Sequence, residues 1–240
     1  MQTGLERSRR VVEMGKYRHE FKYLIDSIQL EELRAKLSNI IQLDSNVGEK
    51  GYYEIRSLYF DDYNNTCYYE NENGTDPREK YRIRLYNGNV SDLKLELKRK
   101  QAGKTLKTAC TMDPSFCRRL MNREHLYMED ADCDLMRKFC LWQDMQGLEP
   151  KVIVEYDRIP FVCEDGNVRI TLDMNMRSSM RIEDFMQQEI MSRPIMPKGM
   201  HLLEVKYDEF LPDYIYKTIQ MRSLKQTAFS KYYLCRKYSL

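Results

Sequence analysis

The sequence predicts an α+β fold in which an antiparallel β-barrel encloses charged side chains and helices pack outside it. Five segments place charged or polar residues at every second position, and side chains on a strand alternate between its two faces. These positions are 18, 20 and 22; 82 and 84; 94, 96, 98 and 100; 169, 171 and 173; and 204 and 206. The water-facing side of an open sheet accounts for one or two such segments. Five of them, with both signs of charge on one face, favour a closed barrel with a charged lumen and an apolar outer face covered by helices.

A hairpin at the centre of the chain carries the densest charge pattern. Asn87-Gly88 follows the strand 81–86 and favours a tight turn, because such turns need positive φ. On the next strand, 93–100, lysines and one glutamate at even positions face away from three leucines. Folding brings two cationic faces together, and they repel each other unless an anion or water lies between them.

The remaining elements follow from local patterns along the chain. Residues 1–13 are polar and basic and predict a disordered lead-in. Alternation predicts strands over 17–25, 52–60, 106–112, 151–158, 168–173 and 201–207. Caps and helical spacing predict helices that begin at Asp26 or Ser27 (with Leu30, Leu33, Leu37 and Ile40 on one face), at Asp113-Pro114, over 132–146 and at Leu211-Pro212. Turn residues predict a loop over 71–79 and a turn over 164–167, and 177–199 reads as irregular.

Composition limits the classes of function. The chain has 240 residues, and 32% of them are charged, but the net charge is only +2, so bulk charge implies no nucleic-acid partner. Seven cysteines without a CxxC pair indicate reduced thiols and a cytoplasmic location. No apolar run is long enough for a transmembrane helix. Gly103-Lys104-Thr105 is not a phosphate-binding P-loop, because Lys98 stands where the first glycine is needed.

Arginine and lysine side chains that line a closed lumen require anionic ligands, and guanidinium forks suit phosphate oxygens. Carboxylates among them suit a hard divalent cation that bridges phosphates. The pattern therefore predicts a polyphosphate-type ligand and metal-assisted phosphoryl chemistry.

The same residues resemble the VTC domain, the polyphosphate polymerase domain of the triphosphate tunnel metalloenzymes (the CYTH-like superfamily), and on this reading residues 14–240 form one such domain. The resemblance runs from about Tyr17 to Tyr233. It is carried by the order and spacing of Phe21-Lys22-Tyr23, Ser57-Leu58-Tyr59-Phe60-Asp61, Tyr81-Arg82-Ile83-Arg84, Leu95-Glu96-Leu97-Lys98, Tyr156-Asp157-Arg158, Val168-Arg169-Ile170-Thr171-Leu172-Asp173, Leu203-Glu204-Val205-Lys206 and Phe229-Ser230-Lys231.

The resemblance implies an eight-stranded antiparallel tunnel and a set of site residues. It implies catalytic roles for Arg82, Arg84, Arg169 and Lys231, and substrate binding by Lys22, Lys98, Lys104, Arg158, Lys206 and Ser230. It implies a Mn or Mg ion on Glu204, assisted by Glu96 and Glu20. Two positions depart from simple expectation: Arg18 replaces the first glutamate of the Glu-x-Glu-x-Lys opening, and alternation separates Arg158 from the face of Glu155 and Asp157, so that a bulge is needed.

Three functions fit this sequence. The first is transfer of the terminal phosphoryl group of ATP to a growing polyphosphate chain. The second replaces the acceptor by water and gives a tripolyphosphatase or nucleoside triphosphatase. The third is a non-catalytic module that binds polyphosphate or RNA. RNA is disfavoured, because no aromatic stacking platform interleaves with the cations 98–100 and 104–107.

Overall fold

The computed structural model describes residues 13–220 and 224–237, so that most of the predicted lead-in over 1–13 lies outside the described residues. Eight antiparallel strands of eight residues or more form its main sheet. They are β2 (His19–Asp26), β4 (Tyr53–Asp61), β5 (Arg78–Tyr86), β6 (Leu93–Gln101), β7 (Lys104–Met112), β8 (Glu149–Cys163), β9 (Val168–Ser179) and β11 (Met200–Tyr207). Of three two-residue strands, β1 (Glu13–Met14) pairs with β7 at one edge, β3 (Gln42–Leu43) pairs with β8, and β10 (Arg193–Pro194) pairs with β9. The order is β1-β7-β6-β5-β4-β8-β9-β11-β2, and the predicted eight-stranded α+β architecture is confirmed.

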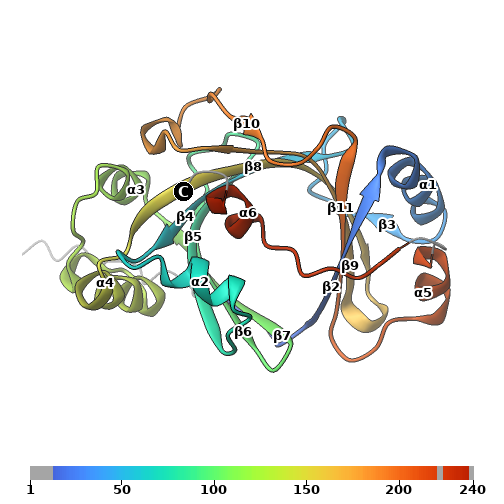
Figure 1. Ribbon diagram of the computed structural model, residues 1–240, viewed down its shortest axis with the longest axis horizontal. Helices are drawn as coiled ribbons and strands as arrows, with labels where there is room; N and C mark the ends of the chain where they lie inside the picture. The colour runs from blue at the N-terminus through green and yellow to red at the C-terminus, as the bar shows by residue number, and fades with distance from the viewer. Residues whose placement is uncertain (1–12, 221–223, 238–240) are drawn as a thin grey trace, which may run out of the picture.

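The sheet curls into a half-barrel whose two ends meet at one point (Figure 1). Arg18, just before β2, and Thr105 in β7 exchange both backbone hydrogen bonds, at 2.9 and 3.0 Å. Residues 226–227 continue the edge of β2, since Gln226 bridges to Tyr23 and the Thr227 amide donates to the Lys22 carbonyl. Ladder pairing between β2 and β7 is therefore short, and the chain near the C-terminus borders the gap.

Helices cover the convex face of the sheet on two sides, as the alternating apolar residues predict (Figure 1). Helices α3 (Pro114–Met121) and α4 (Asp134–Gln146) pack on the outer side of β4–β7, around Phe60, Ile83 and Phe139. Helices α1 (Ser27–Ser38) and α5 (Asp213–Ile219) pack on β2, β8, β9 and β11. The outward residues of each strand are thereby removed from water, and the inward residues are left for the site.

The concave face has its own smaller core, formed by a helix that the sequence patterns did not predict. Helix α6 (Lys231–Lys237) lies inside the curve of the sheet (Figure 1). Its Tyr232 and Cys235 are buried against inward side chains that include Tyr59 and Val154. The Tyr232 hydroxyl donates to the carboxylate of Asp61, which also accepts from the backbone amides of 62, 67 and 68. This bond anchors α6 to the end of β4.

Local sequence signals predicted most element boundaries to within a few residues of their positions in the structure. Asp26 caps α1 in a capping box with Gln29, Asp113 caps α3, and Asn87 and Gly88 have φ of 50° and 67°. Three expectations differ from the structure. Ile40 lies beyond the end of α1, and β9 and β10 occupy part of the stretch read as irregular. The loop expected over 71–79 is shorter, because α2 (Thr66–Glu72), which was not predicted, reaches Glu72 and β5 begins at Arg78.

Candidate functional site

The concave face of the half-barrel gathers the charged residues that alternate along its strands. Three buried carboxylate centres organise them: Glu96 on β6, Asp173 on β9, and the pair Glu20 and Glu204 on β2 and β11. Each centre holds two or more lysine or arginine side chains. Together they bring most of the predicted site residues into contact.

Glu96 forms the first centre and is 1% exposed. Arg82, directly opposite on β5, lies 2.6 Å from its carboxylate, and Arg84 lies at 3.9 Å. Lys107 on β7 approaches the second oxygen at 3.2 Å. Burial opposes ionisation of Glu96, but Arg82, Arg84 and Lys107 outweigh it, so its pKa lies well below the ordinary value.

Asp173 forms the second centre and is fully buried. Arg158 on β8 donates hydrogen bonds to both carboxylate oxygens, at 2.6 and 2.8 Å. The ammonium of Lys231, at the start of α6, lies 2.6 Å from the same carboxylate. Lys231 also lies 4.6 Å from the centre of the Tyr156 ring. Burial opposes ionisation here too, but the two cations lower the pKa of Asp173. Helix α6 therefore supplies a cation to the concave face.

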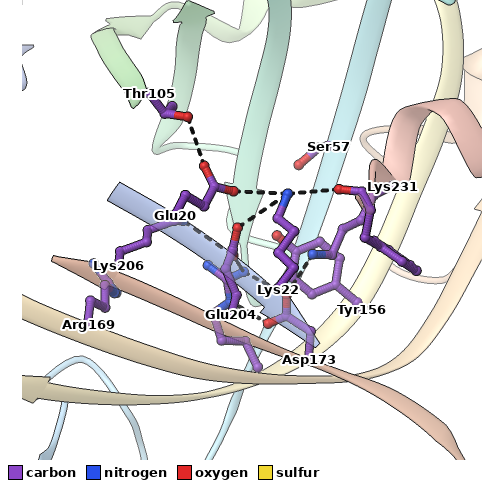
Figure 2. Close-up of polar contacts among 12 residues, drawn as sticks. Glu20, Lys22, Ser57, Thr105, Tyr156, Arg169, Asp173, Glu204, Lys206 and Lys231 are labelled. Atoms are coloured by element: carbon purple, nitrogen blue, oxygen red, sulfur yellow. Dashed lines mark hydrogen bonds and ion pairs between the residues drawn. The ribbon is translucent and has the colours of Figure 1, made fainter. Parts of the chain in front are cut away.

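The third centre joins β2 and β11, where Lys22 is directly opposite Glu204. Figure 2 shows Lys22 between the two carboxylates: its ammonium lies 2.9 Å from Glu20 and 3.7 Å from Glu204, and it donates to the Phe229 carbonyl at 2.8 Å. Lys98 reaches Glu20 from β6 at 2.8 Å. Lys206 and Arg158 each approach Glu204 at 3.3 Å.

Hydroxyl groups link the centres. Tyr59 accepts from Arg82 at 2.9 Å, Tyr156 accepts from Arg84 at 3.1 Å, and Thr105 donates to Glu20 at 3.0 Å. Burial raises the pKa of Tyr59, but Arg82 and Arg84 outweigh it and lower that pKa to about 8. The cations on this face therefore produce a strong local positive field.

Three predicted residues lie outside these centres. Arg169 points toward the rim, where it donates to Asp44 and Tyr53 at 2.7 and 2.9 Å. Ser230 accepts from the Tyr233 amide at 3.3 Å and so caps α6. Lys104 is exposed at the β6–β7 turn, on the opposite face of β7 from Thr105, and the expectation that it lines the lumen was wrong.

The bulge expected at Arg158 is not on β8 itself: the pairing of β8 with β9 does shift register between Glu155 and Asp157, but the extra residue is on β9. Arg158, Tyr156 and Val154 all face the concave side, whereas Glu155 and Asp157 face outward. Glu155 binds Arg56 at 2.8 Å on the convex side. Alternation along β8 was therefore correct, and its acidic face had been assigned to the wrong side of the sheet.

Several residues of this face had no predicted role. Asp173 was placed on an alternating segment, but no role was predicted for its carboxylate. Thr105 was missed because the strand was expected to begin at 106, whereas Lys107 lies inside that predicted strand but was considered only as a contact for RNA. Lys80 shares the face of Arg82 and was outside the predicted hairpin strand, whose start was set at 81. Extending these two strands by one residue each would have found Thr105 and Lys80.

Two of the predicted metal ligands fit a divalent cation, and one does not. Glu20 and Glu204 lie side by side, and despite burial, neighbouring lysines keep the pKa of each below its ordinary value. Mg²⁺ commonly takes one or two carboxylates and fills its other positions with water and phosphate. Glu96 is the single carboxylate of the first centre, without the second one that pairs Glu20 with Glu204, and Arg82 and Lys107 hold its two oxygens. Within residues 13–220 and 224–237, no cluster of three or more His, Cys, Asp or Glu side chains could hold a metal alone.

Comparison with known proteins agrees with this geometry. The family model described as the VTC domain matches residues 17–240. A candidate adenylyl cyclase from Hippeastrum, described as having a dominant triphosphatase activity, has the same fold with a TM-score of 0.54 at 14% identity, over 94% of this chain and 97% of that one. A candidate adenylate cyclase from Bacillus halodurans aligns over 85% and 87% at 14% identity, with a TM-score of 0.44.

Curated proteins gave no match to this sequence. Across the described part of the chain, each helix is too short or too polar to cross a membrane.

Proposed function

The chain belongs to the VTC domain family, and from this premise we propose that it catalyses metal-dependent phosphoryl transfer, with ATP as the donor and polyphosphate as the growing acceptor.

One observation carries the proposal: the three centres hold more positive than negative charge. Ion pairs to Glu20, Glu96, Asp173 and Glu204 involve eight cations, namely Lys22, Arg82, Arg84, Lys98, Lys107, Arg158, Lys206 and Lys231. Eight cations against four carboxylates leave an excess of four positive charges. A triphosphate supplies negative charge of this order and many acceptor oxygens, so it complements the face better than a single small anion does.

The side chains have separable tasks in this reaction. Arg82, Arg84 and Arg158 offer planar forks for non-bridging phosphate oxygens, and Lys231 supplies a point charge from α6. These groups hold the donor and neutralise charge that develops as the phosphoryl group transfers. Glu20 and Glu204 would hold a Mn or Mg ion, which when bound neutralises phosphate oxygens and helps to align donor and acceptor.

Hydrolysis is the second candidate. The fold is shared with a Hippeastrum protein that is described as having a dominant triphosphatase activity. Water in the acceptor position would give a tripolyphosphatase or nucleoside triphosphatase with the same residues.

The experiment incubates the purified chain with ATP and Mn or Mg, and with tripolyphosphate, and separates products by length on a gel. Polymer longer than the added phosphate supports the transferase, and orthophosphate alone supports hydrolysis. Arg82→Ala is expected to lower affinity for triphosphate by roughly ten- to a hundredfold, the value of one charge-assisted hydrogen bond. Arg99→Ala, on the opposite face of the neighbouring strand, is the matched control. If neither product forms and triphosphate does not bind, the proposal is wrong.

A further inference from the structure

The concave face carries a buried tyrosine that has no task in the proposed reaction. Tyr59 on β4 is 6% exposed and lies directly opposite Arg82 on β5. Its hydroxyl accepts a hydrogen bond from Arg82 at 2.9 Å, and the guanidinium carbon of Arg82 lies 5.7 Å from the centre of its ring. The ring also packs on Tyr232 of α6, with the two ring centres 5.5 Å apart. Tyr59 therefore connects the first centre to the helix that carries Lys231.

A phenol hydroxyl can accept one hydrogen bond and donate another, and Tyr59 uses only the first of these capacities. Its oxygen accepts from Arg82, but among residues 13–220 and 224–237 no acceptor takes its own proton. The hydroxyl of Tyr232 differs, because it donates to Asp61. A phosphate oxygen that Arg82 binds beside Tyr59 can therefore take this proton in a second hydrogen bond.

The charged groups that face Tyr59 from the elements around it are cations. The residue opposite on β8 is Val152, which carries no charge. Asp61 shares the face of Tyr59 on β4, but its carboxylate is taken by backbone amides and by Tyr232. Burial raises the pKa of Tyr59, but the cations outweigh it and lower that pKa to about 8. They are Lys22 on β2, Lys80, Arg82 and Arg84 on β5, and Lys231 on α6.

We propose that Tyr59 is a proton-dependent contact for phosphate. With its proton, the hydroxyl donates to a phosphate oxygen that Arg82 also binds. Once the proton has passed to water, the phenolate is a fifth anion on the concave face and competes with the ligand for Arg82. The inference rests on the proposed function and makes it more specific, because it gives the same site an upper pH limit. Since the ligand prefers the protonated form, binding raises the pKa of Tyr59, and above about pH 8 the affinity falls by up to about tenfold per pH unit.

The test uses two phenylalanine variants and tripolyphosphate without added metal. Tyr59→Phe removes the hydroxyl but keeps the ring that packs on Tyr232. Tyr81→Phe is the matched control, because Tyr81 is also buried but lies in the outer core, and its hydroxyl has no hydrogen-bond partner among the described residues. Burial raises the pKa of Tyr81, so this residue does not ionise near pH 8. Ultraviolet absorbance of tyrosinate follows ionisation, and binding is measured at about pH 7 and about pH 9.5, on either side of the lowered pKa.

We expect one tyrosine of the parent to ionise near pH 8, below the usual value of about 10, and tripolyphosphate to raise that midpoint by about one pH unit or more. Tyr59→Phe should lack this step, and Tyr81→Phe should keep it. At about pH 7, Tyr59→Phe should bind tripolyphosphate roughly tenfold more weakly than the parent, and at about pH 9.5 within about twofold. The ratio of the two affinities decides, because ionisation of the ligand and of Lys80 affects both proteins alike.

A second variant keeps the inference falsifiable if Tyr59→Phe does not fold. Burial raises the pKa of Tyr86, but Arg84 outweighs it and lowers that pKa, so Tyr86 is the other tyrosine that can ionise early. In Tyr86→Phe the step near pH 8 should persist and should still move upward with tripolyphosphate. Its loss would assign the step to Tyr86 and overturn the inference.

Three results with Tyr59→Phe would also overturn the inference and leave the proposed phosphoryl transfer standing. The first is a step near pH 8 of the same size in the variant and in the parent. The second is a midpoint in the parent that tripolyphosphate does not raise. The third is a ratio of affinities that is the same at both pH values, which would make Tyr59 only a structural support for Arg82. If the parent does not bind tripolyphosphate at either pH, the proposed function fails and the inference fails with it.

Discussion

Asp173→Asn gives the sharpest test of how charge is balanced on the concave face. Asp173 is fully buried and binds Arg158 through two oxygens and Lys231 through one. Asparagine keeps the shape but removes the charge. Two buried cations are then left with much weaker compensation, and one of them belongs to α6.

The expected cost follows from this geometry. Removal of one partner from a buried ion pair costs about 3–5 kcal/mol, and we take about 3 kcal/mol because the amide oxygen still accepts one hydrogen bond. For a domain of this length each kcal/mol shifts the melting temperature by about 2–4 °C. The variant should therefore melt ~6–12 °C below the parent without ligand.

Ligand should stabilise the variant more than it stabilises the parent. Tripolyphosphate at a hundred times its dissociation constant stabilises the parent by about 2.7 kcal/mol. In Asp173→Asn the ligand no longer competes with Asp173 for Arg158 and Lys231, so a tenfold gain in affinity would add about 1.4 kcal/mol. Thermal melts with and without tripolyphosphate measure both quantities. Asp157→Asn, the same substitution on the outer face of β8, is the control and should change neither.

The reasoning would be refuted by an Asp173→Asn protein that melts like the parent. It would also be refuted if the variant melts lower and gains less from tripolyphosphate, because Asp173 would then orient Arg158 and Lys231 for the ligand rather than compete with it.

Two further predictions concern the metal and pH. The Glu204→Gln variant should still bind tripolyphosphate without metal, but added Mn or Mg should strengthen that binding much less than in the parent. Binding measured during a metal titration tests this, and an unchanged metal response would make Glu204 only an ion-pair partner. The pKa of Lys80 and that of Lys98 lie near 8 in the empty protein, and a bound polyanion raises them, so polyphosphate binding should take up protons near pH 8–9 and weaken as pH rises above about 8. Calorimetry in two buffers of different ionisation enthalpy measures that uptake, and identical heats in both buffers would contradict it.

The alternation of residues along strands predicted which side chains share a face, because period two is set by backbone geometry alone. Arg82 with Arg84, Glu96 with Lys98, and Glu204 with Lys206 share the concave face in the structure as expected. Alternation does not tell which of the two faces turns inward. At β8 either face could have turned inward, and the face that carries Glu155 was wrongly expected to do so.

The contributions of the C-terminal segment could not be derived from local pattern. Lys22 and Phe229 are 207 positions apart, and Tyr232 and Asp61 are 171 apart, yet both pairs are hydrogen-bonded. Helix α6 has only seven residues, and a helix of that length depends on tertiary packing rather than on propensity. Only the resemblance placed Lys231 in the site, and no signal indicated that it enters on a helix inside the curve of the sheet.

The sequence also implied that the empty concave face repels itself, and the structure shows where this holds. At the three centres, carboxylates hold Arg82, Arg158 and Lys231 in place. Under the proposed function, phosphate binding there is an exchange of one anion for another, which favours ligands with several closely spaced charges over single small ions. Arg78, Lys80 and Lys100 form no ion pair with a carboxylate among the described residues, and Glu70 interacts with Arg78 and Lys80 only at longer range, so that part of the repulsion between these cations remains. The two regions therefore differ: substitution of a cation at a centre should lower stability without ligand, whereas substitution of Lys80 or Lys100 should not.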